Sequence, residues 1–78
     1  MKEQDIYNVI AEALGLKAGS VSVDDGADTI QEWDSLGFLS ILSALEHKFG
    51  SKVAAIDDLA KVKSVREIVD IFKREGII

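Results

Sequence analysis

The chain has 78 residues, 47% of them hydrophobic, which is enough for one small folded domain but leaves little room for a catalytic pocket with a full substrate site. It has no cysteine, which excludes a disulfide framework and any zinc site built on thiolates. Its net charge of −5 is uneven, because residues 1–46 hold nine acidic and two basic side chains whereas residues 47–78 hold five acidic and seven basic ones. An acidic first half disfavours nucleic acid and is typical either of a surface for basic protein partners or of a solubilising surface.

The first predicted helix lies near the N-terminus, where apolar residues recur at helical spacing: Ile6, Val9, Ile10, Ala13 and Leu14. Gly15 follows as the predicted C-terminal cap. The next segment, residues 15–34, is long for a connection between helices, so we expect it to be functional or to pack across the core. Four of its apolar side chains can supply that packing: Leu16, Val21, Val23 and Ile30.

The same segment contains a small acidic group, Asp24, Asp25 and Asp28. The spacing of these residues is not that of a calcium loop, and no glutamate stands at the twelfth position of such a loop. We therefore interpret them as solvated loop carboxylates.

The second predicted helix runs from about residue 35 to residue 49, with Gly50 behind it. On a helical wheel at about 100° per residue, the predicted core face consists of four apolar residues: Phe38, Leu42, Leu45 and Phe49.

The other side of this helix is polar apart from two leucines, and it carries Leu36, Leu39, Ser40, Ser43, Glu46 and His47. Leu36, Leu39 and Ser43 form a candidate docking patch, although the start of a helix can also bury against a loop.

The third predicted helix begins at the capping box SVRE, residues 64–67, with Ser64 as N-cap, and it ends at Gly76. Its core face is expected to carry Val65, Ile68, Val69 and Phe72. In the preceding segment, Asp57 is expected to cap one short helical turn. The predicted fold is therefore all-α: residues 1–78 form a single domain, a small irregular four-helix bundle of three main helices and one short helix with a long first loop.

Ser35 stands out in the stretch WDSLGFL, residues 33–39. A serine nucleophile needs a base within hydrogen-bond reach, but the only histidine, His47, lies twelve residues further along the same helix, about 18 Å away. No G-x-S-x-G elbow is present either. We therefore expect no enzyme: either another protein activates Ser35, or Asp34 or Ser35 serves only as the helix N-cap.

Residues 34–50, DSLGFLSILSALEHKFG, resemble the signature of acyl carrier proteins, in which Asp-Ser-Leu opens a helix that continues through ALE and ends in FG. The resemblance covers the whole chain in length and layout. It implies that a phosphopantetheinyl transferase esterifies Ser35 with 4′-phosphopantetheine from coenzyme A, using Mg²⁺. It also implies that the arm's thiol carries acyl or aminoacyl groups as thioesters, and that Asp34 helps to dock the transferase.

The chain departs from the fatty-acid carriers at several positions. Trp33 stands where glycine is common, Gly37 and Ser40 stand where acids are common, and after Asp34 only Glu46 keeps a negative charge on the second helix. We therefore expect a carrier for a dedicated pathway, such as polyketide, nonribosomal-peptide-like or D-alanyl transfer, rather than for general fatty-acid synthesis. Trp33 is interpreted as a loop anchor packed on the bundle, with a lid over the arm as the alternative.

The wheel and the resemblance together place the contact face for acyl- or aminoacyl-loading and transfer enzymes at Leu36, Leu39, Ser43 and Glu46. No apolar run approaches the roughly 18 residues of a membrane span, and the N-terminal stretch MKEQDIYNVI becomes polar at once. We expect a complete cytoplasmic protein, monomeric because it is small and charged. The alternative is a small helical protein-interaction module in which Ser35 is only a cap, so that Ser35→Ala costs about 1 kcal/mol of stability and changes no biochemistry.

Overall fold

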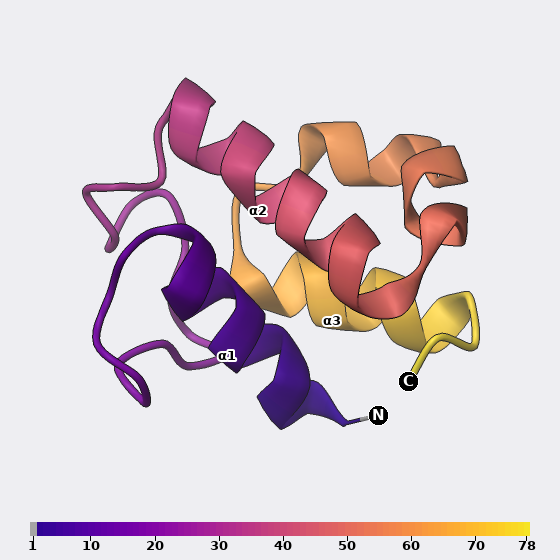
Figure 1. The fold of residues 1–78 in the computed structure, drawn as a ribbon, viewed down its shortest axis with the longest axis horizontal. Coiled ribbons are helices and arrows are strands. Elements are labelled where there is room, and N and C mark those ends of the chain that lie inside the picture. Colours follow the sequence, from indigo (N-terminus) through magenta and orange to yellow (C-terminus); the bar gives the residue numbers. More distant parts are fainter. Residues whose placement is uncertain (1) are drawn as a thin grey trace.

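The computed structural model describes residues 2–78, which fold into three α-helices and two short 3-10 helices (Figure 1). In chain order these are α1 (Glu3–Ala13), α2 (Ser35–Phe49), η1 (Ser51–Ala55), η2 (Asp57–Lys61) and α3 (Val65–Arg74). The predicted all-α bundle with a long first loop is confirmed, and the expected short helix is present as the two 3-10 segments. Within residues 2–78 no helix is both long and apolar enough to span a membrane.

Helix α1 ends as its sequence predicts. Gly15 has φ of 70°, a left-handed conformation that glycine adopts without steric cost. The amide of Leu16 then donates to the carbonyl oxygen of Ala11 at 2.8 Å, which satisfies a carbonyl that the helix leaves without a partner. Gly76, with φ of 73°, ends α3 in the same way.

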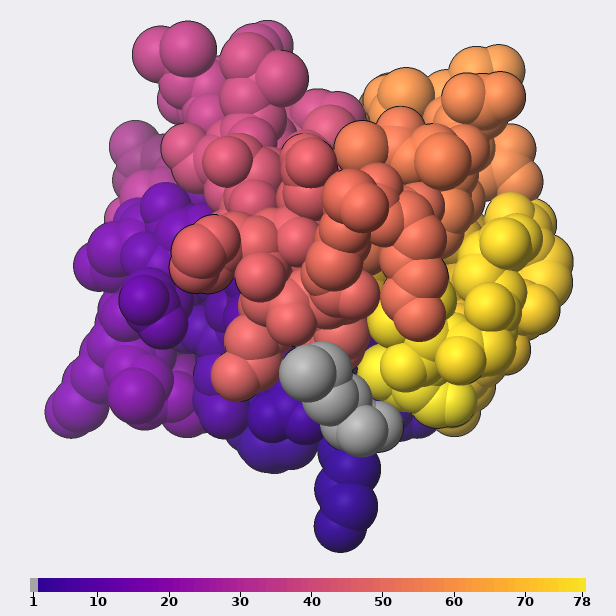
Figure 2. All heavy atoms as spheres, turned by 45° about the vertical axis from the view of Figure 1, so that its right-hand side comes forward, coloured from indigo at the N-terminus to yellow at the C-terminus, as the bar shows by residue number. Residues whose placement is uncertain are grey.

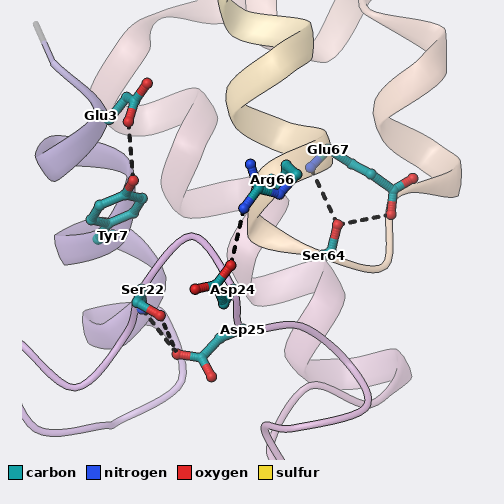
Figure 3. Close-up of polar contacts among 8 residues, drawn as sticks. All are labelled: Glu3, Tyr7, Ser22, Asp24, Asp25, Ser64, Arg66 and Glu67. Carbon is teal, nitrogen blue, oxygen red and sulfur yellow. Dashed lines mark hydrogen bonds and ion pairs between the residues drawn. The ribbon is translucent and has the colours of Figure 1, made fainter.

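Helix α3 begins at the predicted cap. The Ser64 hydroxyl accepts a hydrogen bond from the Glu67 amide at 3.2 Å, and it donates to the Glu67 carboxylate at 3.0 Å (Figure 3). The predicted capping role of Asp57 is wrong, because η2 starts at Asp57 itself and Ile56 occupies the cap position without a side-chain hydrogen bond. Asp57 lies inside the 3-10 helix, and the extended cap conformation belongs to Ile56, whose apolar side chain cannot accept a hydrogen bond from the helix.

The core lies where the three α-helices meet, and its largest fully buried side chains are Ile6, Ile10, Ile41, Leu45, Val65, Ile68 and Phe72. The rings of Phe49 and Phe72 meet edge to face with centroids 5.1 Å apart, which joins α2 to α3. One part of the predicted core face of α2 is wrong: Ile41, which the wheel left out, is fully buried, whereas Phe38 and Leu42 are half-buried. The reason is that α2 packs against α1 on one side and η1 on another, so its buried stripe turns towards Ile41.

The long loop packs as expected. Val21 and Ile30 are buried, and Leu16 and Val23 are half-buried. The loop is also fastened to the start of α3, because the Val65 amide donates to the Asp25 carbonyl oxygen at 2.9 Å.

Two further backbone contacts join the long loop to the segment before α3. Gly26 pairs with Ser64 in an isolated antiparallel bridge, and the amide of Ala27 donates to the carbonyl oxygen of Lys63 at 2.8 Å. A Cβ on Gly26 would lie 2.6 Å from that same carbonyl oxygen, so the close approach requires glycine.

The acidic side chains of the loop differ from one another. Asp24 forms an exposed ion pair with Arg66 at 3.0 Å (Figure 3). The Asp25 carboxylate accepts hydrogen bonds from the Ser22 amide at 2.9 Å and the Thr29 hydroxyl at 3.0 Å, and these bonds hold the pKa of Asp25 below its ordinary value. The Asp25 carboxylate therefore also shapes the turn, a role that the interpretation as a solvated loop carboxylate did not include.

Candidate functional site

The start of α2 depends on Asp34. Its backbone is extended, with φ of −104° and ψ of −166°, and its carboxylate accepts a hydrogen bond from the Gly37 amide at 2.8 Å. Asp34 is therefore the N-cap, one of the two alternatives that the sequence left open.

Ser35 is the first residue of the helix, and the alternative in which it caps the helix is wrong. A cap at Ser35 would need the amide of Gly37 or Phe38, but these amides already donate to the Asp34 carboxylate and the Asp34 carbonyl oxygen, each at 2.8 Å. The Ser35 hydroxyl is exposed and forms no hydrogen bond with another group of residues 2–78. It is accessible to a second protein and has no structural task that modification would disturb.

His47 lies far from Ser35 in the structure, as the sequence indicated. His47 lies on α2 near its opposite end and is exposed. A separation of twelve residues along one helix corresponds to about 18 Å, far beyond a hydrogen bond. His47 therefore cannot act as a base for Ser35.

Gly37 allows the preceding loop to lie close against the first turn of α2. A Cβ at this position would overlap the carbonyl oxygen of Glu32 and would come within 3.0 Å of the Leu14 side chain. The sequence indicated Gly37 only as a departure from an acidic pattern, whereas the structure shows that a side chain has no room there.

Trp33 is an anchor, as interpreted. Its side chain is buried, with 6% exposed, and its amide donates to the Ile30 carbonyl oxygen at 3.0 Å. The indole therefore fixes the loop immediately before Asp34 and Ser35, which places the serine at a constant position on the bundle.

A shallow hollow of about 400 Å³ adjoins Ser35. Trp33, Phe38 and Val62 contribute apolar walls, and the lysines at positions 61 and 63 contribute exposed side chains. Figure 2 shows the start of α2, in magenta, and the segment around residue 60, in light orange, at the same side of the molecule. Sequence reasoning missed the two lysines, and the basic character of the second half of the chain was the available signal.

The predicted contact face is exposed along its whole length. Leu36, Leu39, Ser43 and Glu46 follow one another at intervals of three or four residues, so they lie on one stripe of α2. Leu36 has 76% of its surface exposed and Leu39 has 61%. Ser43 and Glu46 also border a groove of about 380 Å³ between α2 and the 3-10 segments.

No cluster of three or more histidine and acidic side chains in residues 2–78 is arranged to hold a metal ion. Asp24 and Asp25 instead have protein partners, as described above.

The comparisons with known proteins gave one finding. The family model described as "phosphopantetheine attachment site" matches residues 4–72, which run from α1 into α3 and include the whole of α2 and the hollow beside it. Neither the search of curated proteins nor the search of solved structures gave a match.

Proposed function

The chain belongs to the family of phosphopantetheine attachment domains, and from this premise we propose that Ser35 bears its covalent 4′-phosphopantetheine arm. Domains of this family are carriers rather than catalysts. One observation carries the assignment: the Ser35 hydroxyl is exposed and unbonded at the first residue of α2, beside a hollow. By contrast, the hydroxyls of Ser20, Ser22 and Ser64 are engaged in turns or in a cap.

The residues around Ser35 fit a phosphodiester. The amides of Ser35 and Leu36 lie in the first turn of α2 and have no acceptor within the helix, so they and the helix dipole favour a negative group there. In the proposed loading step, Ser35 Oγ forms a P–O bond to the pantetheine phosphate of coenzyme A, and the P–O bond to the nucleotide breaks. The serine proton passes to a base of the transferase, because His47 is out of reach. When attached, the arm supplies a terminal thiol for thioester formation, a group that the chain itself lacks.

We propose that the cargo is an acyl or aminoacyl group and that the loading and transfer enzymes dock on the stripe formed by Leu36, Leu39, Ser43 and Glu46. The exposure of the two leucines supports this surface. Apolar contacts there would supply affinity, and Glu46 would act mainly on association rate and partner choice. Tethering the cargo raises its effective concentration at each partner's active site.

A kinetic comparison tests this surface. Leu36→Ala should raise the KM of the transferase or a loading enzyme for this carrier, whereas the neighbouring Ser40→Ala should not. Equal KM values for the two variants would contradict docking on the stripe.

We further propose that residues 1–78 act as a single carrier domain of a dedicated pathway, monomeric and cytoplasmic. One hydrophobic cluster, which includes residues from Ile6 to Phe72, supports the single domain. After Asp34, Glu46 is the only acidic residue on α2, which supports partners other than those of general fatty-acid synthesis. In the alternative of an interaction module, Ser35 served only as a cap, but Asp34 takes that position; the family match supports the carrier.

Mass spectrometry tests the attachment directly. Incubation with coenzyme A, Mg²⁺ and a broad-specificity phosphopantetheinyl transferase should add about 340 Da. Ser35→Ala should abolish the addition, whereas Ser40→Ala, an exposed serine on the same helix, should keep it. Absence of the addition from the wild type, or its survival in Ser35→Ala, would overturn the proposal.

A further inference from the structure

The two lysines beside the hollow form no ion pair with residues 2–78. Lys61 and Lys63 are exposed, and neither ammonium group pairs with a carboxylate of residues 2–78. The other bases near the C-terminus are engaged, because Arg66 pairs with Asp24, Lys73 with Glu3, and Arg74 with Asp58 and Glu75. The two residues that carry these unpaired charges therefore both line the hollow beside the proposed attachment serine.

The same place has a charge problem that these lysines can solve. A phosphodiester on Ser35 would bring a negative charge next to the Asp34 carboxylate, and that carboxylate already occupies the Gly37 amide. Like charges at such short range repel one another. Lys61 and Lys63 are the basic residues that border the hollow and so can offset both negative charges.

The lining of the hollow combines apolar and basic residues. Trp33 and Val62 are buried and Phe38 is half-buried, so each presents only part of an apolar side chain to the hollow. Apolar side chains beside exposed basic ones match a ligand whose anionic end is followed by a branched alkyl part, as in phosphopantetheine.

We propose that this hollow is the resting site of the proximal part of the arm, with Lys61 and Lys63 facing the phosphodiester and Trp33, Phe38 and Val62 facing the dimethyl group that follows. This proposal rests on the proposed attachment at Ser35. In this proposal, segment 60–63 holds the arm against the bundle until a partner withdraws the arm. The docking stripe on α2 does not have this task. It also makes the resting position dependent on salt, because exposed ion pairs are screened.

The experiment compares apo and holo protein by ¹H–¹⁵N NMR, with ³¹P NMR of the phosphodiester. In the wild type, loading should shift the amide resonances of residues 61–63 and the indole resonance of Trp33, the only tryptophan of the chain. In about 1 M NaCl, where the screening length falls to about 3 Å, the shifts at residues 61–63 should shrink and the ³¹P resonance should move.

A matched pair of variants isolates the two lysines. Lys61→Glu/Lys63→Glu and the control Lys48→Glu/Lys52→Glu each change the net charge from −5 to −9, since each reversal removes two units, and all four lysines are exposed. The first variant should lose most of the loading-induced shifts at Trp33 and at residues 61–63, and the control should keep them. Circular dichroism of both variants checks that the helices are intact.

The outcomes separate this proposal from the attachment itself. If mass spectrometry shows the loaded protein but the wild-type shifts are confined to the residues next to Ser35 in the chain, the resting site is wrong and the attachment stands. Equal loss of the shifts in both variants would also overturn the role of Lys61 and Lys63, because it would trace the effect to net charge alone. If Ser35 takes no group at all, the attachment fails first.

Discussion

Substitutions at Asp34 and Ser35 separate the two tasks that the start of α2 combines. Asp34→Ala removes the 2.8 Å hydrogen bond from the Gly37 amide, and loss of an N-cap costs about 1 kcal/mol. It also removes a negative charge from the positive end of the helix dipole, for about 0.3–1 kcal/mol more. Ser35→Ala removes no hydrogen bond, so it should change the free energy of unfolding by less than about 0.5 kcal/mol. In a domain of this size, each kcal/mol corresponds to about 4–8 °C in Tm.

Thermal and urea unfolding, followed by circular dichroism, measure these differences. Asp34→Asn adds a third variant, because asparagine keeps a side-chain oxygen for the cap but carries no charge. It should therefore lose less stability than Asp34→Ala. If the Asp34 carboxylate docks the transferase, Asp34→Asn and Asp34→Ala should lose kcat/KM for loading to a similar extent, because both lack the negative charge.

The reasoning fails if Ser35→Ala destabilises the domain as much as Asp34→Ala, because Ser35 would then be the cap. It also fails if Asp34→Ala leaves the stability unchanged, since the bond to Gly37 would then contribute nothing in solution. Loading of Asp34→Asn at the wild-type rate would show that Asp34 acts on the helix alone.

Three further substitutions test the packing, the turn and the loop fastening. Gly37→Ala should lower the free energy of unfolding, measured in urea, by about 1–3 kcal/mol, because the new Cβ would overlap with the preceding loop. This loss is expected although alanine ordinarily stabilises a helix by about 1 kcal/mol relative to glycine. Unchanged or higher stability would contradict the close approach. The pKa of Asp25 is lower in the folded state, so its carboxylate contributes stability above its ordinary pKa of 3.8, and this contribution disappears as the pH falls through the lower, folded value. Asp25→Asn should therefore lose less stability on acidification than the wild type. The Asp28 side chain forms no hydrogen bond in residues 2–78, so the control Asp28→Asn should follow the wild-type profile. Identical profiles for all three proteins would count against the hydrogen-bonded turn. A double-mutant cycle on Asp24 and Arg66, whose side chains are 82% and 61% exposed, should give a coupling below about 1 kcal/mol, and a much larger value would indicate a buried pair.

The limits of the helices could be predicted because their signals are local. Gly15 and Gly76 end α1 and α3 with left-handed residues, and Ser64 caps α3, all within one or two turns of the residues they affect. The same kind of local signal limits the N-cap of α2 to Asp34 or Ser35. Only the hydrogen bonds of the folded chain decide between them, because the amide of Phe38 is already taken by the Asp34 carbonyl oxygen.

The sequence by itself therefore determined the all-α class, the helix limits and the candidate serine, since periodicity, caps and the motif at residues 34–50 depend on neighbours in the chain. The tertiary structure alone decided which face of α2 is buried at Ile41, why Gly37 admits no side chain, and which lysines border the hollow beside Ser35. The buried face at Ile41 and the lining of the hollow depend on segments that lie far apart in the sequence, and the lack of room at Gly37 depends on Glu32 and Leu14, which lie outside α2. Helical spacing carries no information about what packs against a helix from outside it.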